Sequence, residues 1–178
     1  IEKARQAGES IDYLTFVPDG EPTLDANLGV EIELLRSLGI KIAVITNASL
    51  IWREDVREDL AAADWVSLKV DAAQEGVWRR IDRPHGALRL AAILEGMLAF
   101  APIYRGTLVT ETMLVAGIND DAASVEAVAA FLARLKPARA YLSIPTRPPT
   151  EEWVHAPDEA TLNRAYQTIS RRGLAVEY

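Results

Sequence analysis

Short apolar runs alternate with amphipathic segments along almost the whole chain. The runs are rich in Val, Ile, Leu, Thr and aromatic residues and cover 13–17, 42–46, 65–70, 107–114 and 140–144. Continuous apolar runs of this length are typical of parallel strands that are buried on both faces. The pattern therefore predicts five buried strands.

Helical periodicity fills the segments between these runs. Apolar residues recur at spacings of three and four from 24 to 38, with Thr23 as a candidate N-cap and Gly39 as a left-handed stop. The same stripe covers 125–135, after an Asn-Asp-Asp start at 119–121, and 162–169, between Asp158 and Gly173. Further helices are predicted within 52–64 and 88–100, and 1–8 resembles the end of a crossover helix.

This alternation predicts an α/β fold with a parallel sheet and right-handed crossovers. Periodicity alone does not separate an open sheet from a sheet curled into a barrel. In both cases ligands bind at the carboxyl ends of the strands. No linker or repeat interrupts the sequence, so we expect residues 1–178 to form one domain.

Composition narrows the class of protein. With 49% hydrophobic and 25% charged residues, the chain is typical of a globular cytoplasmic protein, and no run is long enough to span a membrane. The absence of cysteine excludes disulfides and thiolate metal sites within this chain. His85 and His155 are not spaced as a metal pair, so we expect no metal bound by these residues. The net charge of −7 argues against a surface that follows a phosphate backbone throughout.

Polar residues gather where the predicted strands end. Taken singly they are ordinary: Gly20 and Pro22 suit a turn, Ser49 a helix cap, and Lys69 with Asp71 a salt bridge. Together they suggest more, because a glutamate beside a glycine suits capture of an ammonium group, and a lysine two strands away suits a carboxylate. The set, with Glu21 as its acid, predicts a site for an amino-acid headgroup.

The run DGEPTL at 19–24 resembles the Gly-Gly-Glu-Pro element of the radical S-adenosylmethionine (radical SAM) enzymes, and the resemblance extends over nearly all of the chain. It implies a partial parallel (β/α) barrel in which Gly20, Glu21 and Pro22 bind the methionine amino group of S-adenosylmethionine; Asp19 stands where the family has its first glycine. It also implies contacts to the methionine carboxylate or ribose from Asn47, Ser49, Ser67, Lys69 and Asp71. MLVAGIND and SIPTRPP resemble the adenine-side and substrate-side edges.

One branch of the family matches further. The run VSLKVDAAQEGVWRRIDRPHG, together with VITNAS, is similar to the wyosine-base synthases, which modify a guanosine in transfer RNA; enzymes that activate glycyl-radical proteins match this run less well. A basic cluster within it would suit phosphates, although a solvated helix face has the same pattern. Trp78 suits either base stacking or the core. Candidate substrate-binding residues are Arg83, His85 and Arg147, and the cluster consists of Arg79, Arg80, Arg83, His85 and Arg89.

The family's three-cysteine CxxxCxxC loop, which ligates three irons of a [4Fe-4S] cluster, is missing. Either the protein has become a binding module, or the chain is the later part of the barrel. Because it begins with Ile1 and with a helix that no strand precedes, we expect the first strand and the cluster loop to have been lost upstream. The chain alone is then inactive. The resemblance implies that the intact protein makes a deoxyadenosyl radical, with electrons from a donor such as flavodoxin or ferredoxin.

Two other readings of the sequence remain open. A lysine on a central strand, here Lys69, is where cofactor-independent α/β-barrel lyases and isomerases place a Schiff-base nucleophile. A cysteine-free binding domain that retains the fold without catalysis is the other. Cysteines upstream would argue against both.

Overall fold

The strands of the computed structural model, which describes residues 1–17, 20–149 and 151–178, form a single parallel sheet. Their order in the sheet is their order in the chain, and every neighbouring pair is parallel. This arrangement confirms the predicted α/β partial parallel barrel. The strands are β1 (Tyr13–Phe16), β2 (Lys41–Thr46), β3 (Trp65–Lys69), β4 (Thr107–Met113), β5 (Arg139–Ser143) and β6 (Val176–Glu177).

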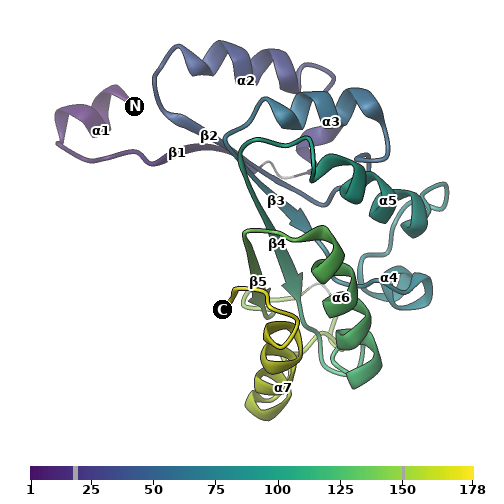
Figure 1. Ribbon diagram of the computed structural model, residues 1–178. Coiled ribbons are helices and arrows are strands. Elements are labelled where there is room, and N and C mark those ends of the chain that lie inside the picture. The colour runs from purple at the N-terminus through teal and green to yellow at the C-terminus, as the bar shows by residue number, and fades with distance from the viewer. Residues whose placement is uncertain (18–19, 150) are drawn as a thin grey trace.

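The long helices lie along one side of the sheet (Figure 1). Neighbouring helices contact one another in the pairs α2–α3, α5–α6 and α6–α7, and in the described part of the chain no helix covers the opposite face. None of the described helices is both long and apolar enough to cross a bilayer. The helices are α1 (Glu2–Gln6), the 3₁₀ turn η1 (Pro22–Leu24), α2 (Leu28–Arg36), α3 (Glu54–Ala61), α4 (Glu75–Ile81), α5 (Leu90–Phe100), α6 (Ala122–Leu135) and α7 (Glu159–Ser170).

The two faces of the sheet differ because side chains alternate along a strand. Val44, Val66 and Leu68 are 0% exposed and join the apolar core beneath the helices. The other face is polar: Lys69 on β3 pairs in register with Glu111 on β4. The sheet thus isolates a polar concave face from the core and sets its charged residues near the strand ends.

Several predicted boundaries are confirmed. Asp121 caps α6 by accepting from the backbone N–H groups of Ala123 and Ser124, and Asp158 caps α7. Gly39 and Gly173 adopt left-handed φ values of 66° and 79° after α2 and α7, as helix stops do.

Three local features differ from the sequence prediction. Thr23 is not an N-cap: it lies inside η1, whose cap is Glu21, and α2 begins only at Leu28. The helix α4 was not assigned because its seven residues bury only Trp78 and show no apolar stripe. The strand β6 was missed because it has only two residues. Asp19, which replaces the family's first glycine, lies outside the described residues.

Gly96 should not tolerate a larger side chain. A Cβ atom there would lie 2.6 Å from the carbonyl oxygen of Ile51, so α5 would have to move away from the loop that follows β2. We expect Gly96→Ala to lower the free energy of unfolding by about 1–3 kcal/mol, the usual cost of overpacking. Gly76→Ala is the matched control, because a Cβ there meets nothing within 4 Å; it should raise stability by about 0.5 kcal/mol. Urea unfolding of both variants checks the pair, and equal effects would contradict the assigned contact.

Candidate functional site

A small pocket of about 150 Å³ opens at the carboxyl ends of β2, β3 and β4. It brings together five of the residues predicted from the sequence. Two others, Ser49 and Asp71, line a neighbouring cavity, and Pro22 begins η1. The predicted residues in the pocket are Gly20, Glu21, Asn47, Ser67 and Lys69.

Glu21 is held by hydrogen bonds from two neighbouring segments. Its Oε1 accepts from the backbone N–H of Thr23 at 3.1 Å and from the Thr23 hydroxyl at 2.8 Å. The hydroxyl of Thr46, at the end of β2, also donates to Oε1, and the backbone N–H of Asn47 donates to Oε2 at 2.7 Å. The side chain of Glu21 therefore ties η1 to β2.

Among the residues that the structure describes, the donors to Glu21 leave one acceptor position of its carboxylate free. A carboxylate offers about four lone-pair sites, two on each oxygen. Oε1 is crowded by three donors, whereas Oε2 has one, and the residue is 9% exposed at the pocket wall. The open site on Oε2 suits a cationic donor, because charge-assisted hydrogen bonds to a carboxylate are the strong ones.

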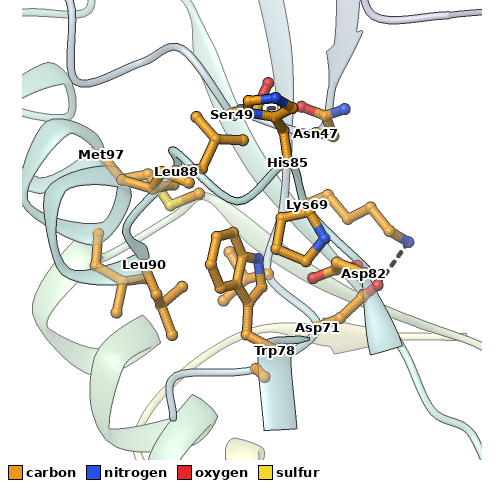
Figure 2. A pocket seen from close by; sticks show the side chains of 15 residues that line it. Asn47, Ser49, Lys69, Asp71, Trp78, Asp82, His85, Leu88, Leu90 and Met97 are labelled. Atoms are coloured by element: carbon orange, nitrogen blue, oxygen red, sulfur yellow. Dashed lines mark hydrogen bonds and ion pairs between the residues drawn. The ribbon is translucent and has the colours of Figure 1, made fainter. Parts of the chain in front are cut away.

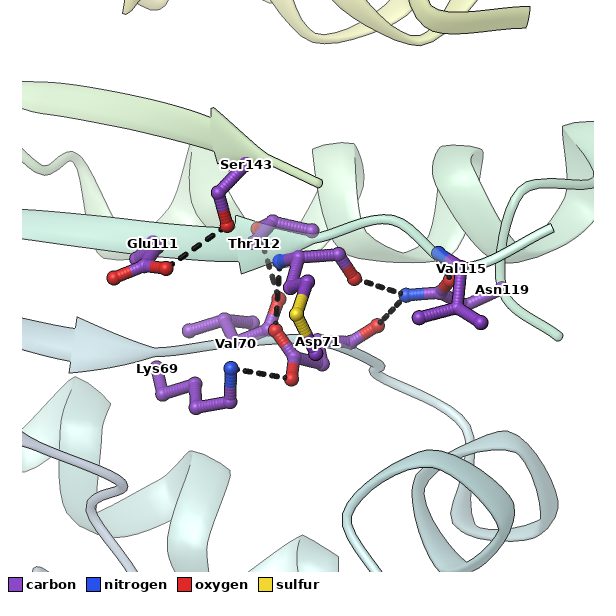
Figure 3. Close-up of polar contacts among 9 residues, drawn as sticks. Lys69, Val70, Asp71, Glu111, Thr112, Val115, Asn119 and Ser143 are labelled. Atoms are coloured by element: carbon purple, nitrogen blue, oxygen red, sulfur yellow. Dashed lines mark hydrogen bonds and ion pairs between the residues drawn. The ribbon is translucent and has the colours of Figure 1, made fainter. Parts of the chain in front are cut away.

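Lys69 supplies the positive charge of the same pocket (Figure 3). Its Nζ lies 2.8 Å from Oδ2 of Asp71, whose side chain is 0% exposed, while the Lys69 side chain is 32% exposed. Burial acts to lower the pKa of Lys69, but the charge and hydrogen bond of Asp71, with smaller effects from Asp82 and Glu111, raise it overall. Lys69 therefore stays an ammonium group that faces the pocket.

Asp71 also fastens β3 to β4, with the help of Asn119. The backbone N–H of Met113 donates to Oδ1 of Asp71 at 2.8 Å. The amide of Asn119 donates to the carbonyl oxygens of Asp71 and Met113, each at 2.8 Å, and its Oδ1 accepts from the N–H of Val115 at 2.8 Å (Figure 3). These contacts fix the ends of two strands, and with them the base of the Lys69 side chain.

Glu111 lies across the pocket on β4 and was named in the sequence only as a strand-end residue. Its Oε1 accepts from the Ser143 hydroxyl at 2.9 Å (Figure 3), which joins β4 to β5. The pocket thus presents one ammonium between two carboxylates, those of Glu21 and Glu111. Side chains alternate along β3 and β4, and this alternation puts Glu111 and Lys69 on the same face of the sheet. The same signal in the sequence could have identified Glu111 as part of the site.

A second cavity of about 300 Å³ shares Asn47 and Lys69 with the first (Figure 2). Its inner wall is apolar, formed by Trp78 and by side chains of α5, and its rim carries Asp82 and His85. Burial, and next the charge and hydrogen bond of Asp71, raise the pKa of Asp82 to about 8 against the lowering effect of Lys69. A carboxyl group with a raised pKa therefore borders this cavity.

Two arginines of the basic cluster are ion-paired with acidic side chains. Arg79 forms an ion pair with Glu75 at 2.6 Å, Arg83 forms one with Glu151 at 2.5 Å, and Arg80 donates to the carbonyl oxygen of Gly117. Trp78 is 6% exposed and belongs to the core. The other two candidate substrate-binding residues lie in different surroundings. His85 borders the second cavity, whereas Arg147 is exposed in the loop after β5.

An iron–sulfur cluster does not fit the residues of this chain. The chain has no cysteine to supply thiolate ligands. Within the described ranges, no group of three His, Cys, Asp or Glu side chains gathers in a metal-binding arrangement. The charged pocket instead fits a zwitterionic organic ligand.

Comparison with known proteins agrees with this fold. The family model of the Radical SAM superfamily matches residues 1–132. A UPF0026 protein of Methanocaldococcus jannaschii is 54% identical over 149 residues, which make up 84% of this chain and 46% of that protein. The chain thus spans about half the length of the relatives it matches, including a Helicobacter pylori UPF0026 protein that is 38% identical over 143 residues.

Solved structures show the same architecture. A radical SAM methyltransferase from Sphaerobacter thermophilus superposes with a TM-score of 0.77 at 19% identity, over 99% of this chain and 53% of that one. The structure of TYW1 with a lysine-pyruvate adduct bound gives a TM-score of 0.73 at 19% identity, over 96% of this chain and 53% of that one. At these identities the likeness concerns the fold.

Proposed function

The chain belongs to the radical SAM superfamily, and on that basis we propose that it forms the part of a radical SAM enzyme that holds the methionine end of S-adenosylmethionine. The observation that carries the proposal is the pairing of Glu21 and Lys69 in one pocket at the strand ends. A carboxylate with a free acceptor position and an ammonium group together match the two charges of an amino-acid headgroup.

The residues of the pocket have distinct roles in this proposal. Glu21 accepts from the ligand ammonium through Oε2, with Gly20 leaving the approach open. Lys69 donates to the ligand carboxylate, and Asp71 positions Lys69 from below without touching the ligand. Ser67 and Asn47 line the same pocket and contribute hydroxyl and amide groups. Fixing both ends of the headgroup orients the remainder of the molecule.

The chemistry belongs to the complete protein, meaning the protein that contains this chain and its cluster-binding segment. A [4Fe-4S] cluster held by that other segment would supply the reductive chemistry, and the residues of this chain would hold the methionine end of S-adenosylmethionine. The concave face of β2 to β5 shields one side of the ligand from water, and its charged residues fix the orientation. Transfer RNA as the substrate stays a prediction from sequence resemblance.

The environment of Lys69 argues against the Schiff-base alternative. A lysine that attacks a carbonyl group must be deprotonated, which requires a lowered pKa. Here Asp71 raises the pKa of Lys69 despite its burial, so the amine stays protonated at neutral pH. The geometry therefore favours binding of a carboxylate by Lys69 over covalent catalysis.

Anaerobic binding experiments on the complete protein test the proposal. We expect saturable binding of S-adenosylmethionine and, with a reductant such as dithionite, formation of 5′-deoxyadenosine. Free methionine should compete for the site, because it carries the same ammonium and carboxylate groups. A protein whose cluster is fully assembled but which neither binds S-adenosylmethionine nor is protected by it from urea would contradict the assigned pocket.

A further inference from the structure

Asp82 is a half-buried carboxyl group that has no role in the binding scheme above. It is the C-cap residue of α4, and its backbone N–H donates to the carbonyl oxygen of Trp78. Arg83, directly after it, adopts a left-handed φ of 47°. A non-glycine residue holds that conformation only where surrounding contacts maintain it. The turn places the side chain of Asp82 beside Asp71 and Lys69 (Figure 2).

The contacts of Asp71 favour a proton on its neighbour Asp82. Oδ1 of Asp71 accepts from the backbone N–H of Met113, and Oδ2 faces the ammonium of Lys69. Among the described residues, Oδ2 has no hydrogen-bond partner of good geometry, although Nζ of Lys69 lies 2.8 Å away as an ion-pair partner. Two ionised carboxylates cannot hydrogen-bond to each other, because both are acceptors only. The two side chains lie side by side (Figure 2), so a hydrogen bond between them requires a proton on one of them, and Asp82, whose pKa is raised, is the side chain that retains it.

We propose that Asp82 is a positioning residue for Lys69, acting through a hydrogen bond from its carboxyl group to the Asp71 carboxylate. The proposal rests on the proposed function of Lys69 as the partner of the cofactor carboxylate. With Asp82 neutral, Asp71 carries the single negative charge of the Asp71–Asp82 pair and holds the ammonium of Lys69 at 2.8 Å. The remaining ionisable neighbours are Glu111 on β4 and His85 on the cavity rim.

Ionisation of Asp82 should disturb this arrangement. A second negative charge beside Asp71 repels it and removes the hydrogen bond, and it also competes for the ammonium of Lys69. The pKa of Asp82 is raised from 3.8 to about 8, so the folded protein holds a proton in this range that the unfolded chain has released. The stability that this group contributes is thus complete below about pH 4 and is lost as the pH rises through about 8.

We expect the affinity of wild type for S-adenosylmethionine, relative to that of Asp82→Asn, to change with pH. The amino group of S-adenosylmethionine itself titrates in this pH range, so the wild-type profile alone is ambiguous. Asp82→Asn keeps a neutral donor to Asp71 at every pH and experiences the same ligand titration. Wild type and Asp82→Asn should bind equally at pH 6.5, and by pH 9.5 the wild type should bind on the order of tenfold more weakly.

The complete protein, with S-adenosylmethionine as the probe, is compared as wild type, Asp82→Asn, Asp82→Ala and the control Asp12→Asn, which changes an exposed acid before β1. Asp82→Ala should bind weakly at every pH, and Asp12→Asn should follow the wild type. A second readout needs no ligand: the ¹³C signal of the Asp82 carboxyl, identified by its absence in Asp82→Asn, should titrate near pH 8.

The two readouts separate the failure of this proposal from the failure of the proposed function. A carboxyl titration near pH 4, or an affinity ratio that does not change with pH, overturns the role of Asp82. Absence of S-adenosylmethionine binding in all four proteins overturns the proposed function and, with it, the positioning role. A titration of the Asp82 carboxyl near pH 8, together with an affinity of wild type relative to Asp82→Asn that falls as the pH rises, supports both the positioning role and the proposed function.

Discussion

Replacing Glu21 by Gln should weaken both the fold and the ligand site. An amide nitrogen at the Oε2 position would face the backbone N–H of Asn47, which now donates at 2.7 Å, so two donors would meet. An amide nitrogen at the Oε1 position would face the three donors from Thr23 and Thr46 instead. Either orientation leaves buried donors unpaired, and we expect the free energy of unfolding to fall by about 1–3 kcal/mol.

The same change should reduce the affinity for S-adenosylmethionine by on the order of 10–100-fold, the effect of losing one charge-assisted hydrogen bond. Iron content should be unchanged, because Glu21 is assigned to the ligand and not to iron. Glu31→Gln, at an exposed acid on α2, is the matched control and should alter neither property. Isothermal titration and urea unfolding measure the two effects; unimpaired binding in Glu21→Gln would contradict the assigned role.

Lys69→Met should be strongly destabilising because of the partner it leaves behind. The carboxylate of Asp71 is 0% exposed and would lose its counter-ion. Breaking a buried ion pair in this way costs about 3 kcal/mol or more. In Lys69→Met/Asp71→Asn the buried charge is gone, and the amide oxygen introduced at position 71 can still accept from the N–H of Met113, so most of the lost stability should return.

Affinity should not recover with stability in that double variant. If Lys69 binds the ligand carboxylate directly, Lys69→Met and Lys69→Met/Asp71→Asn should both bind S-adenosylmethionine on the order of 10–100-fold more weakly than wild type. Urea unfolding gives the stability of the three proteins, and equilibrium dialysis gives their affinities. Recovery of wild-type affinity in the double variant would show that Lys69 serves the fold alone.

The main elements and the assembly of the charged residues followed from the sequence. Five apolar runs became β1 to β5, and because parallel strands end at one edge, Glu21 and Lys69 had to meet there. The acidic caps Asp121 and Asp158 also matched, since capping depends on two or three consecutive residues. These features are either local or follow from the topology.

Other contacts were beyond sequence reasoning because they depend on how separate loops meet. The Thr46 hydroxyl reaches Glu21 across 25 positions, and Asn119 reaches the carbonyl oxygen of Asp71 across 48. Neither spacing corresponds to a motif or a period. The position of Asp82 depended on α4, a helix too short and too polar to be identified from its pattern. The predicted site therefore contained Asp71 but not Thr46 or Asn119, which also support its ligand-facing groups.

A thermodynamic cycle that removes the ligand carboxylate and the Lys69 ammonium, separately and together, tests the central claim most directly. Decarboxylated S-adenosylmethionine lacks only the group assigned to Lys69. The complete wild-type protein should bind it on the order of 10–100-fold more weakly than S-adenosylmethionine, whereas Lys69→Met/Asp71→Asn should bind the two ligands equally. An equal loss in both proteins would place the carboxylate elsewhere and contradict the assignment of this pocket to the methionine headgroup.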